Sequence, residues 1–110
     1  MVNHSAPADV FAALGDSRRA WLVDLLAQRD HTVSELAATL PISLPGTLKH
    51  VGVLEAAGLV SRHKTGRTVT VHLEVDRIAE AEQWLRRTRT FWSGQLDSLA
   101  RSFRPHEESR

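Results

Sequence analysis

A connection of only three residues, Pro41-Ile42-Ser43, separates two helical segments near the middle of the sequence. The first segment, SELAATL, ends before the proline. In the second segment Ser43 is a favourable N-cap, Pro45 lies in the first turn where no N–H is needed, and Gly58 stands where a C-cap glycine belongs. A helix-turn-helix is therefore predicted over about residues 33–57.

The hydrophobic period changes from helical to strand-like directly after this unit. The runs LVSRHK and RTVTVHL flank a Thr-Gly dipeptide, and Val69, Val71 and Leu73 alternate with polar residues. Such alternation around a glycine turn indicates a two-stranded hairpin with one buried face. A hairpin over about residues 59–73, placed after a helix-turn-helix, is predicted to form a wing.

The last part of the chain carries an apolar stripe at helical spacing over about residues 76–103, and Pro105 is predicted to end this helix. Such a helix is roughly 40 Å long, and one small domain cannot cover its whole stripe. A short first helix adds further apolar surface, so we expect an isologous homodimer built from the first and last helices. The predicted interface residues are Phe11, Leu14, Leu85, Trp92, Leu96, Leu99 and Phe103.

A second helix, RRAWLVDLLAQ, follows Asp16 or Ser17 as its cap, and its apolar residues cover nearly all of its faces. We expect this helix at the centre of the core. Taken together, the segments predict a single, mostly α-helical domain over residues 1–110 with a β-hairpin wing: a five-helix winged helix-turn-helix that dimerises through its first and last helices.

Positive charge is concentrated in the predicted helix-turn-helix and wing. The 110-residue chain has a net charge of only +1. Residues 41–72, however, carry Lys49, Arg62, Lys64 and Arg67 against the single acid Glu55, a net charge of +3. A local excess of this kind indicates a polyanionic partner.

Other features of the composition exclude whole classes of protein. The absence of cysteine excludes disulfides and thiolate metal sites. The N-terminal residues do not have the pattern of a signal peptide, and no apolar run approaches the ~20 residues that a membrane span needs. A cytoplasmic protein with no membrane contact is therefore expected.

The helix that follows Ser43 has two contrasting faces. At about 100° per residue, Thr47, Val51 and Leu54 turn inward. On or near the opposite face are mostly small side chains and one charge, at Pro45, Leu48, Lys49, Gly52 and Ala56. A helix with so little outward bulk suits the major groove of DNA, about 12 Å wide, although an ordinary surface helix is the alternative.

The predicted base contacts come from this helix and its cap: Ser43, Pro45, Leu48, Lys49 and His50. Pro45 and Leu48 would touch thymine methyl groups, and Lys49 would reach a guanine edge or a phosphate. His50 lies on the flank of the helix. It either donates a hydrogen bond to a phosphate or is a satisfied histidine at the edge of the core.

The wing supplies the predicted contacts to the DNA backbone: Arg62, His63, Lys64, Arg67 and Thr68. A solvated cluster of charges is the alternative. Arg18 and Arg19 open the second helix, where a cation opposes the helix dipole, so a partner is expected there. That partner is either a carboxylate such as Asp16 or a phosphate.

Long stretches of this sequence resemble the ArsR-type (arsenical-resistance repressor) family of winged-helix bacterial transcription regulators. The similar stretches are FAALGDSRRAWLVDLL and VSELAATLPISLPGTLKHVGVLEAAGLVSRHKTGRTVTVHL, within residues 8–75. The C-terminal WLRRTRTFWSGQLDSL is similar to a branch of the family without thiolate metal sites. The resemblance implies a homodimer that binds a palindromic operator and represses its own operon. The sequence departs from the family pattern at Leu48, commonly Ser, and at Gly52, often Lys or Arg.

No constellation of residues indicates an enzyme or a resident cofactor, and none is expected. The six histidines form no i, i+4 pair and no HExxH motif, so no metal site is expected either. Two alternatives stay open beside a DNA-binding repressor. One is a winged-helix module that binds protein through its basic face, and the other is a metal-responsive regulator that uses histidines and carboxylates.

The absence of paired ligands leads to a prediction about metals. Arsenite, cadmium and zinc at stoichiometric doses should leave the affinity for operator DNA unchanged. Affinity measured with and without each metal, and again with EDTA or a dithiol, checks this. Release of DNA by micromolar metal, reversed by the chelator, would contradict it and would place His72 or His106 first among the candidate ligands.

Overall fold

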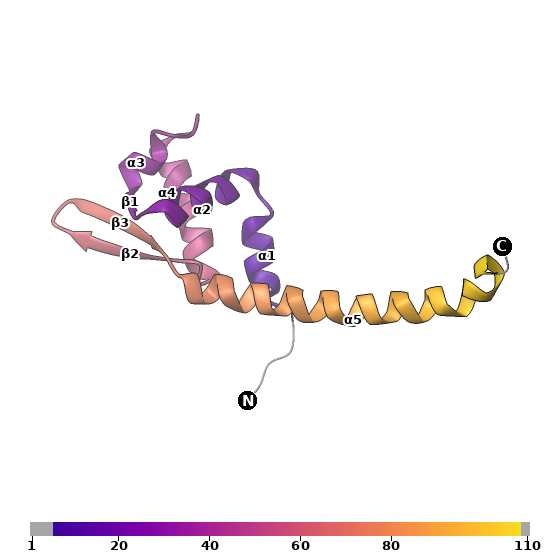
Figure 1. Ribbon diagram of the computed structural model, residues 1–110. Helices are drawn as coiled ribbons and strands as arrows, with labels where there is room; N and C mark the ends of the chain where they lie inside the picture. The colour runs from indigo at the N-terminus through magenta and orange to yellow at the C-terminus, as the bar shows by residue number, and fades with distance from the viewer. Residues whose placement is uncertain (1–5, 109–110) are drawn as a thin grey trace.

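A computed structural model describes the backbone of residues 6–108 and the side chains of residues 6–101. Its elements, in chain order, are α1 (Ala8–Leu14), α2 (Ser17–Gln28), β1 (His31–Thr32), α3 (Val33–Ala37), α4 (Leu44–Ala56), β2 (Val60–Thr65), β3 (Thr68–Leu73) and α5 (Val75–Glu108). The first four helices form one body, the β2–β3 hairpin projects from one side of it, and α5 runs past it on the other side (Figure 1). The predicted fold class, mostly helical with a hairpin wing, is confirmed.

The caps that define the helix-turn-helix are in place. The Thr32 hydroxyl accepts a hydrogen bond from the Glu35 N–H, and the Glu35 carboxylate accepts one from the Thr32 N–H, which makes a capping box at the start of α3. The Ser43 hydroxyl accepts from the Gly46 N–H at the start of α4. Gly58 follows α4 with a φ of 77°, a left-handed conformation that glycine adopts without strain.

The wing belongs to a three-stranded sheet of order β1-β3-β2, in which β1 was not predicted from the sequence. In this strand His31 pairs with Val71 and Thr32 with Thr70. Two residues are too short to show an alternating pattern, so the sequence held no signal for the strand. The hairpin itself pairs from Val60 with Leu73 to Thr65 with Thr68, as its alternation predicted.

Packing of α2 differs from the prediction. Only Leu22 and Leu26 of this helix are buried, and Trp21 is 44% exposed, with its indole N–H donating to the Thr39 hydroxyl. The helix contacts α1, α4 and β3. It therefore packs into the core along one side, and its other side is exposed to solvent. A chain of this size has too few elements to cover every face of an apolar helix.

Arg77 ties three helices together near the base of the body. Its Nε donates to the carbonyl of Ala57 after α4, at 3.0 Å. Its guanidinium also donates to both carboxylate oxygens of Asp9 in α1, at 2.8 and 3.0 Å, and to Glu80 in α5, at 2.8 Å. The first turn of α1, the end of α4 and the start of α5 are therefore held by one side chain.

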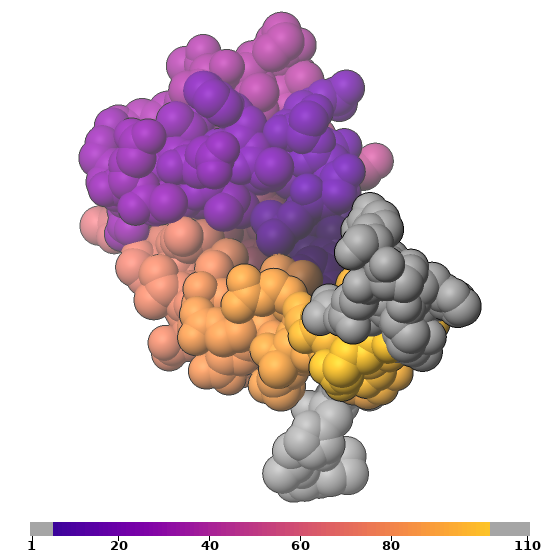
Figure 2. All heavy atoms as spheres, turned by 45° about the vertical axis from the view of Figure 1, so that its right-hand side comes forward, coloured from indigo at the N-terminus to yellow at the C-terminus, as the bar shows by residue number. Residues whose placement is uncertain are grey.

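Helix α5 leaves the body after its first few turns, and the molecule is 72 Å long as a result (Figure 1). The helix continues to Glu108, so the prediction that Pro105 ends it was wrong. Proline has no backbone N–H, so Pro105 costs the helix one hydrogen bond. Only a short piece of helix follows it. In a view turned by 45°, the indigo and magenta body stands above the orange and yellow helix (Figure 2).

The apolar residues predicted for the dimer interface fall into two groups. Leu85, Trp92, Leu96 and Leu99, here called the α5 stripe, are 51–61% exposed. Phe11 and Leu14 of α1 are half-buried against the core, and the Phe11 ring lies 5.5 Å from that of Trp84. The side chain of Phe103 lies outside the described residues. In a single chain the α5 stripe faces solvent.

An ion pair joins strand β3 to the segment that precedes β1. His72 on β3 places its Nδ1 2.7 Å from a carboxylate oxygen of Asp30, which precedes β1. The hydrogen bond that His72 donates to Asp30 raises the pKa of His72 above its ordinary value, and the negative charges of Asp30 and Glu74 act in the same direction. The pair thus favours the protonated histidine in the folded chain.

This pair predicts a pH dependence of stability. A raised folded-state pKa gives stabilisation that is complete below the ordinary value of about 6.5 and is lost as the pH rises through the higher folded value. The thermal midpoint should therefore decrease as the pH is raised from about 6 to about 8. His72→Gln should make that decrease smaller. Thermal scans across this range check it. His63→Gln, at an exposed wing histidine with no acidic partner among the described residues, is the control and should keep the wild-type slope.

Candidate nucleic-acid interface

Helix α4 has one face in the core and one face in solvent. Thr47, Val51 and Leu54 are completely buried, as predicted, and the Thr47 hydroxyl is satisfied by the carbonyl of Ser43. The outward positions Pro45, Lys49, Gly52 and Ala56 are here called the α4 ridge. Leu44, Val53 and Glu55 are exposed beside the ridge. The ridge has little bulk, and its one charge is Lys49.

Leu48 lies beside the ridge and not on it. The side chain is half-buried and packs against the core. It lines a hollow of about 390 Å³ between α4 and the wing, with Leu44, Arg67 and Val69 also in the lining. Leu48 therefore lies at the wing-side edge of the outward face, about 60° around the helix from Pro45.

Ser43 and His50, the other two residues predicted to contact bases, already have partners. The Ser43 hydroxyl is the N-cap of α4 and is exposed. His50 is half-buried, and its Nδ1 lies 3.3 Å from the guanidinium of Arg19. Because arginine is only a donor, this contact requires the lone pair on Nδ1, which leaves Nε2–H as the histidine's free donor.

Arg19 has a partner that was not predicted from the sequence. Its Nε donates to the carbonyl of Ala13 at 2.6 Å, and a terminal nitrogen reaches the carbonyl of Ala12 at 3.4 Å. These carbonyls end α1, where a cation is favourable. The carboxylate of Asp16 instead accepts from the backbone N–H groups of Arg18 and Arg19, and these bonds lower its pKa.

The five wing residues divide into a base and a tip. At the base, Arg62 places Nε 3.0 Å from a carboxylate oxygen of Glu55 and lies over Gly52 of the α4 ridge. The His63 ring is 3.2 Å from the Ser61 hydroxyl. Toward the tip, Lys64, Arg67 and Thr68 are exposed, and within residues 6–101 no ion pair holds either cation. Arg62 therefore supports the wing, whereas Lys64 and Arg67 are available to a ligand.

Arg18 is an available cation that was not among the predicted DNA contacts. Its side chain is exposed at the start of α2, on the flank of α4 that faces away from the wing, where it lines a hollow with Lys49 and His50. The signal in the sequence was the unfavourable position of a cation in the first turn of a helix. That position predicts a partner for the cation but does not identify the partner.

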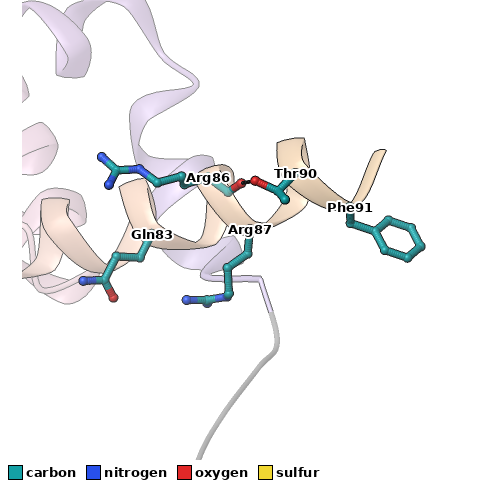
Figure 3. Close-up of a pocket in the computed structure, with 5 residues that line it drawn as sticks. All are labelled: Gln83, Arg86, Arg87, Thr90 and Phe91. Atoms are coloured by element: carbon teal, nitrogen blue, oxygen red, sulfur yellow. Dashed lines mark hydrogen bonds between the residues drawn. The ribbon is translucent and has the colours of Figure 1, made fainter. Parts of the chain in front are cut away.

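A larger hollow, of about 520 Å³, lies on α5 alone. Its lining residues are Gln83, Arg86, Arg87, Thr90 and Phe91, and Figure 3 shows that all five come from successive turns of one helix. The Thr90 hydroxyl donates to the Arg86 carbonyl at 2.9 Å. Since these residues share one helix, the hollow is a feature of the exposed surface of α5.

Two features are absent from the described part of the chain. No three histidine, aspartate or glutamate side chains there gather in a group that could hold a metal ion. No described helix is long and apolar enough to cross a membrane.

A helix-turn-helix with an outward ridge of small residues, followed by a wing with free cations, defines a winged-helix DNA-binding protein. The family described as "Bacterial regulatory protein, arsR family" matches residues 16–62. The chain is 32% identical over 100 residues to the HTH-type transcriptional regulator Rv2034 of Mycobacterium tuberculosis, covering 91% of each protein. It is 29% identical over 77 residues to the transcriptional repressor SdpR of Bacillus subtilis, covering 70% of this chain and 86% of SdpR.

The fold gives the same assignment. The structure of an ArsR-like transcriptional regulator from Rhodococcus sp. RHA1 superposes with a TM-score of 0.77 and 31% identity, covering 87% of this chain and 91% of that one. The chain belongs to the ArsR family. It is a transcriptional regulator with a DNA-binding helix-turn-helix, as the resemblance in the sequence implied.

Proposed function

We propose that the protein is an autoregulating repressor that binds an inverted-repeat operator as a homodimer. The observation that carries this proposal is the α4 ridge, with Lys49 as its one charge, beside the free wing cations Lys64 and Arg67. The similarity to the repressor SdpR supports repression, as opposed to activation, of transcription. Such a protein acts in the cytoplasm, needs no cofactor and catalyses no reaction.

Each half-site is read by α4 lying in the major groove. Pro45 and Lys49 on the ridge contact base edges, and Ser43 lies where the ridge begins. Leu48 reaches a base only from the wing side of the helix. His50 lies on the other side, where its Nε2–H is available to a phosphate. Lys64, Arg67 and Thr68 contact phosphates, with His63 beside them, while Arg62 holds the base of the wing against α4.

The homodimer is proposed from the exposure of the α5 stripe. Helix α5 has 34 residues, which at ~1.5 Å each make a rod of about 50 Å, and much of it lies beyond the body (Figure 1). An isologous contact along α5, together with α1, would cover the stripe on both copies. It would also present two α4 ridges to successive major grooves, ~34–36 Å apart.

The dimer leads to a prediction for α5. Wild-type protein should sediment as a dimer at micromolar concentration. Trp92→Ala should raise the dimer dissociation constant at least fivefold, because a large aromatic side chain in an interface is worth roughly 1 kcal/mol or more. Sedimentation across a concentration series measures this. Arg87→Ala, on the opposite face of the same helix, is the control. A wild-type monomer, with Trp92→Ala no less stable, would rule out this interface.

The DNA contacts lead to a second prediction. Bound sequences recovered from random duplex DNA should share an inverted repeat, and that repeat should occur near the protein's own gene. Lys64→Ala and Arg67→Ala should weaken binding to specific and non-specific DNA alike. Each should also make the slope of log K against log salt shallower by about one unit for each phosphate that is no longer neutralised, counted in both subunits. Lys49→Ala should weaken only the specific site, by about 1–3 kcal/mol.

Leu48 needs a separate comparison, since it is half-buried. If it contacts a thymine methyl group, replacing that thymine by uracil should weaken binding as much as Leu48→Ala does. If the uracil changes nothing while Leu48→Ala abolishes binding, Leu48 only packs the domain and Lys49 carries the base contact. Failure of the wild-type protein to prefer any duplex would overturn the proposed function as a whole.

A further inference from the structure

The flank of α4 that faces away from the wing holds a basic hollow of about 340 Å³. Arg18 and Arg19 enter it from α2, and Lys49 and His50 enter it from α4. Ile42, Gly46 and Val53 complete the lining. Four basic side chains from two helices therefore surround one opening.

These four side chains are not equivalent. Arg19 is held by the carbonyls of α1 and holds His50 in turn, so it fixes the wall of the hollow. Arg18 and Lys49 are exposed, and within residues 6–101 neither side chain has an ion-pair partner. The nearby carboxylate of Asp16 is occupied by two backbone N–H groups and offsets part of the positive charge. Two free cations and the Nε2–H of His50 thus remain as donors.

The position of the hollow indicates its partner. The α4 ridge is bordered on one side by the hollow that contains Arg67 and on the other side by the hollow that contains Arg18. A helix in the major groove likewise has a sugar-phosphate backbone on each side of it, since the groove is only about 12 Å wide. With the wing on one backbone, the Arg18 hollow faces the other.

We propose that this hollow is a second phosphate-binding site, in which Arg18 and His50 Nε2–H bind a backbone phosphate on the side of α4 away from the wing. The proposal rests on the proposed function, because it needs α4 in the major groove. Arg19 is a positioning residue there: it sets the histidine tautomer and joins the site to the end of α1. DNA is then held on both sides of the reading helix.

The first test compares Arg18→Gln with Arg87→Gln, which removes the same charge from an exposed position on α5. Arg18→Gln should weaken specific and non-specific duplex alike. It should also make the negative slope of log K against log salt shallower, by about 0.9 for each lost contact, or close to two units for a dimer. Arg87→Gln should leave the slope unchanged. Equal slopes for the two variants would overturn the inference.

The second test locates the phosphate. Single phosphates of the recovered operator are replaced one at a time by neutral methylphosphonate, and the affinity of each duplex is measured. Wild-type protein should lose affinity at two groups of phosphates, one on each side of the groove. Arg18→Gln should lose its sensitivity only on one side, and Lys64→Ala only on the other. An Arg18→Gln profile identical to that of wild type would contradict the proposal.

A free anion is the other possible source of phosphate, and a third measurement separates it from DNA. Inorganic phosphate is added at constant ionic strength while the thermal midpoint is followed. If phosphate stabilises wild type but not Arg18→Gln, and no methylphosphonate discriminates the two proteins, the site serves a free anion and the DNA contact is overturned. Arg18→Gln should fold normally, because its guanidinium has no hydrogen bond or ion pair within residues 6–101. If Lys64→Ala still weakens DNA binding and its salt dependence, the proposed function holds even when the phosphate site at Arg18 is disproved.

Discussion

The burial of one face of α4 is the constraint on which the other features depend. Thr47, Val51 and Leu54 are completely enclosed, so the helix that carries the α4 ridge is also a core helix. Arg77 binds the carbonyl that follows its last turn, and Arg19 binds His50 near its middle. Both arginines also bind α1. The direction of the ridge is therefore set by the same contacts that hold the domain together, and it cannot turn without opening the core.

The distribution of charge cannot be read from the number of basic residues alone. Arg62 at the base of the wing is paired with Glu55, and Arg77 near the base of the body is paired with Asp9 and Glu80, so both arginines serve the fold. Exposed ion pairs of this kind add little to stability. They do, however, decide which cations remain for a ligand. Among those that remain, Arg67 and Arg18 lie on opposite sides of the α4 ridge. The charge excess over residues 41–72 did not include Arg18.

Local patterns in the sequence predicted what depends on neighbouring residues and missed what depends on distant ones. The Ser43 cap, the left-handed Gly58 and the hairpin alternation follow from residues within one turn or strand, and the structure confirms them. The pairing of β1 with β3, the partner of Arg19 and the lean of Leu48 toward the wing arise from segments far apart in the chain. A helical wheel assigns directions around an axis, but it does not show which neighbouring element covers each direction.

The exposed α5 stripe has a consequence for how much protein a cell must contain. If a second copy covers the stripe, the stability of the folded chain rises with its own concentration, because association draws molecules from the unfolded state. Below the dimer dissociation constant, the amount of DNA-binding species would grow with the square of the total amount. A repressor of its own promoter would then silence that promoter over a narrow range of expression, and the length of α5 would help to set where that range lies.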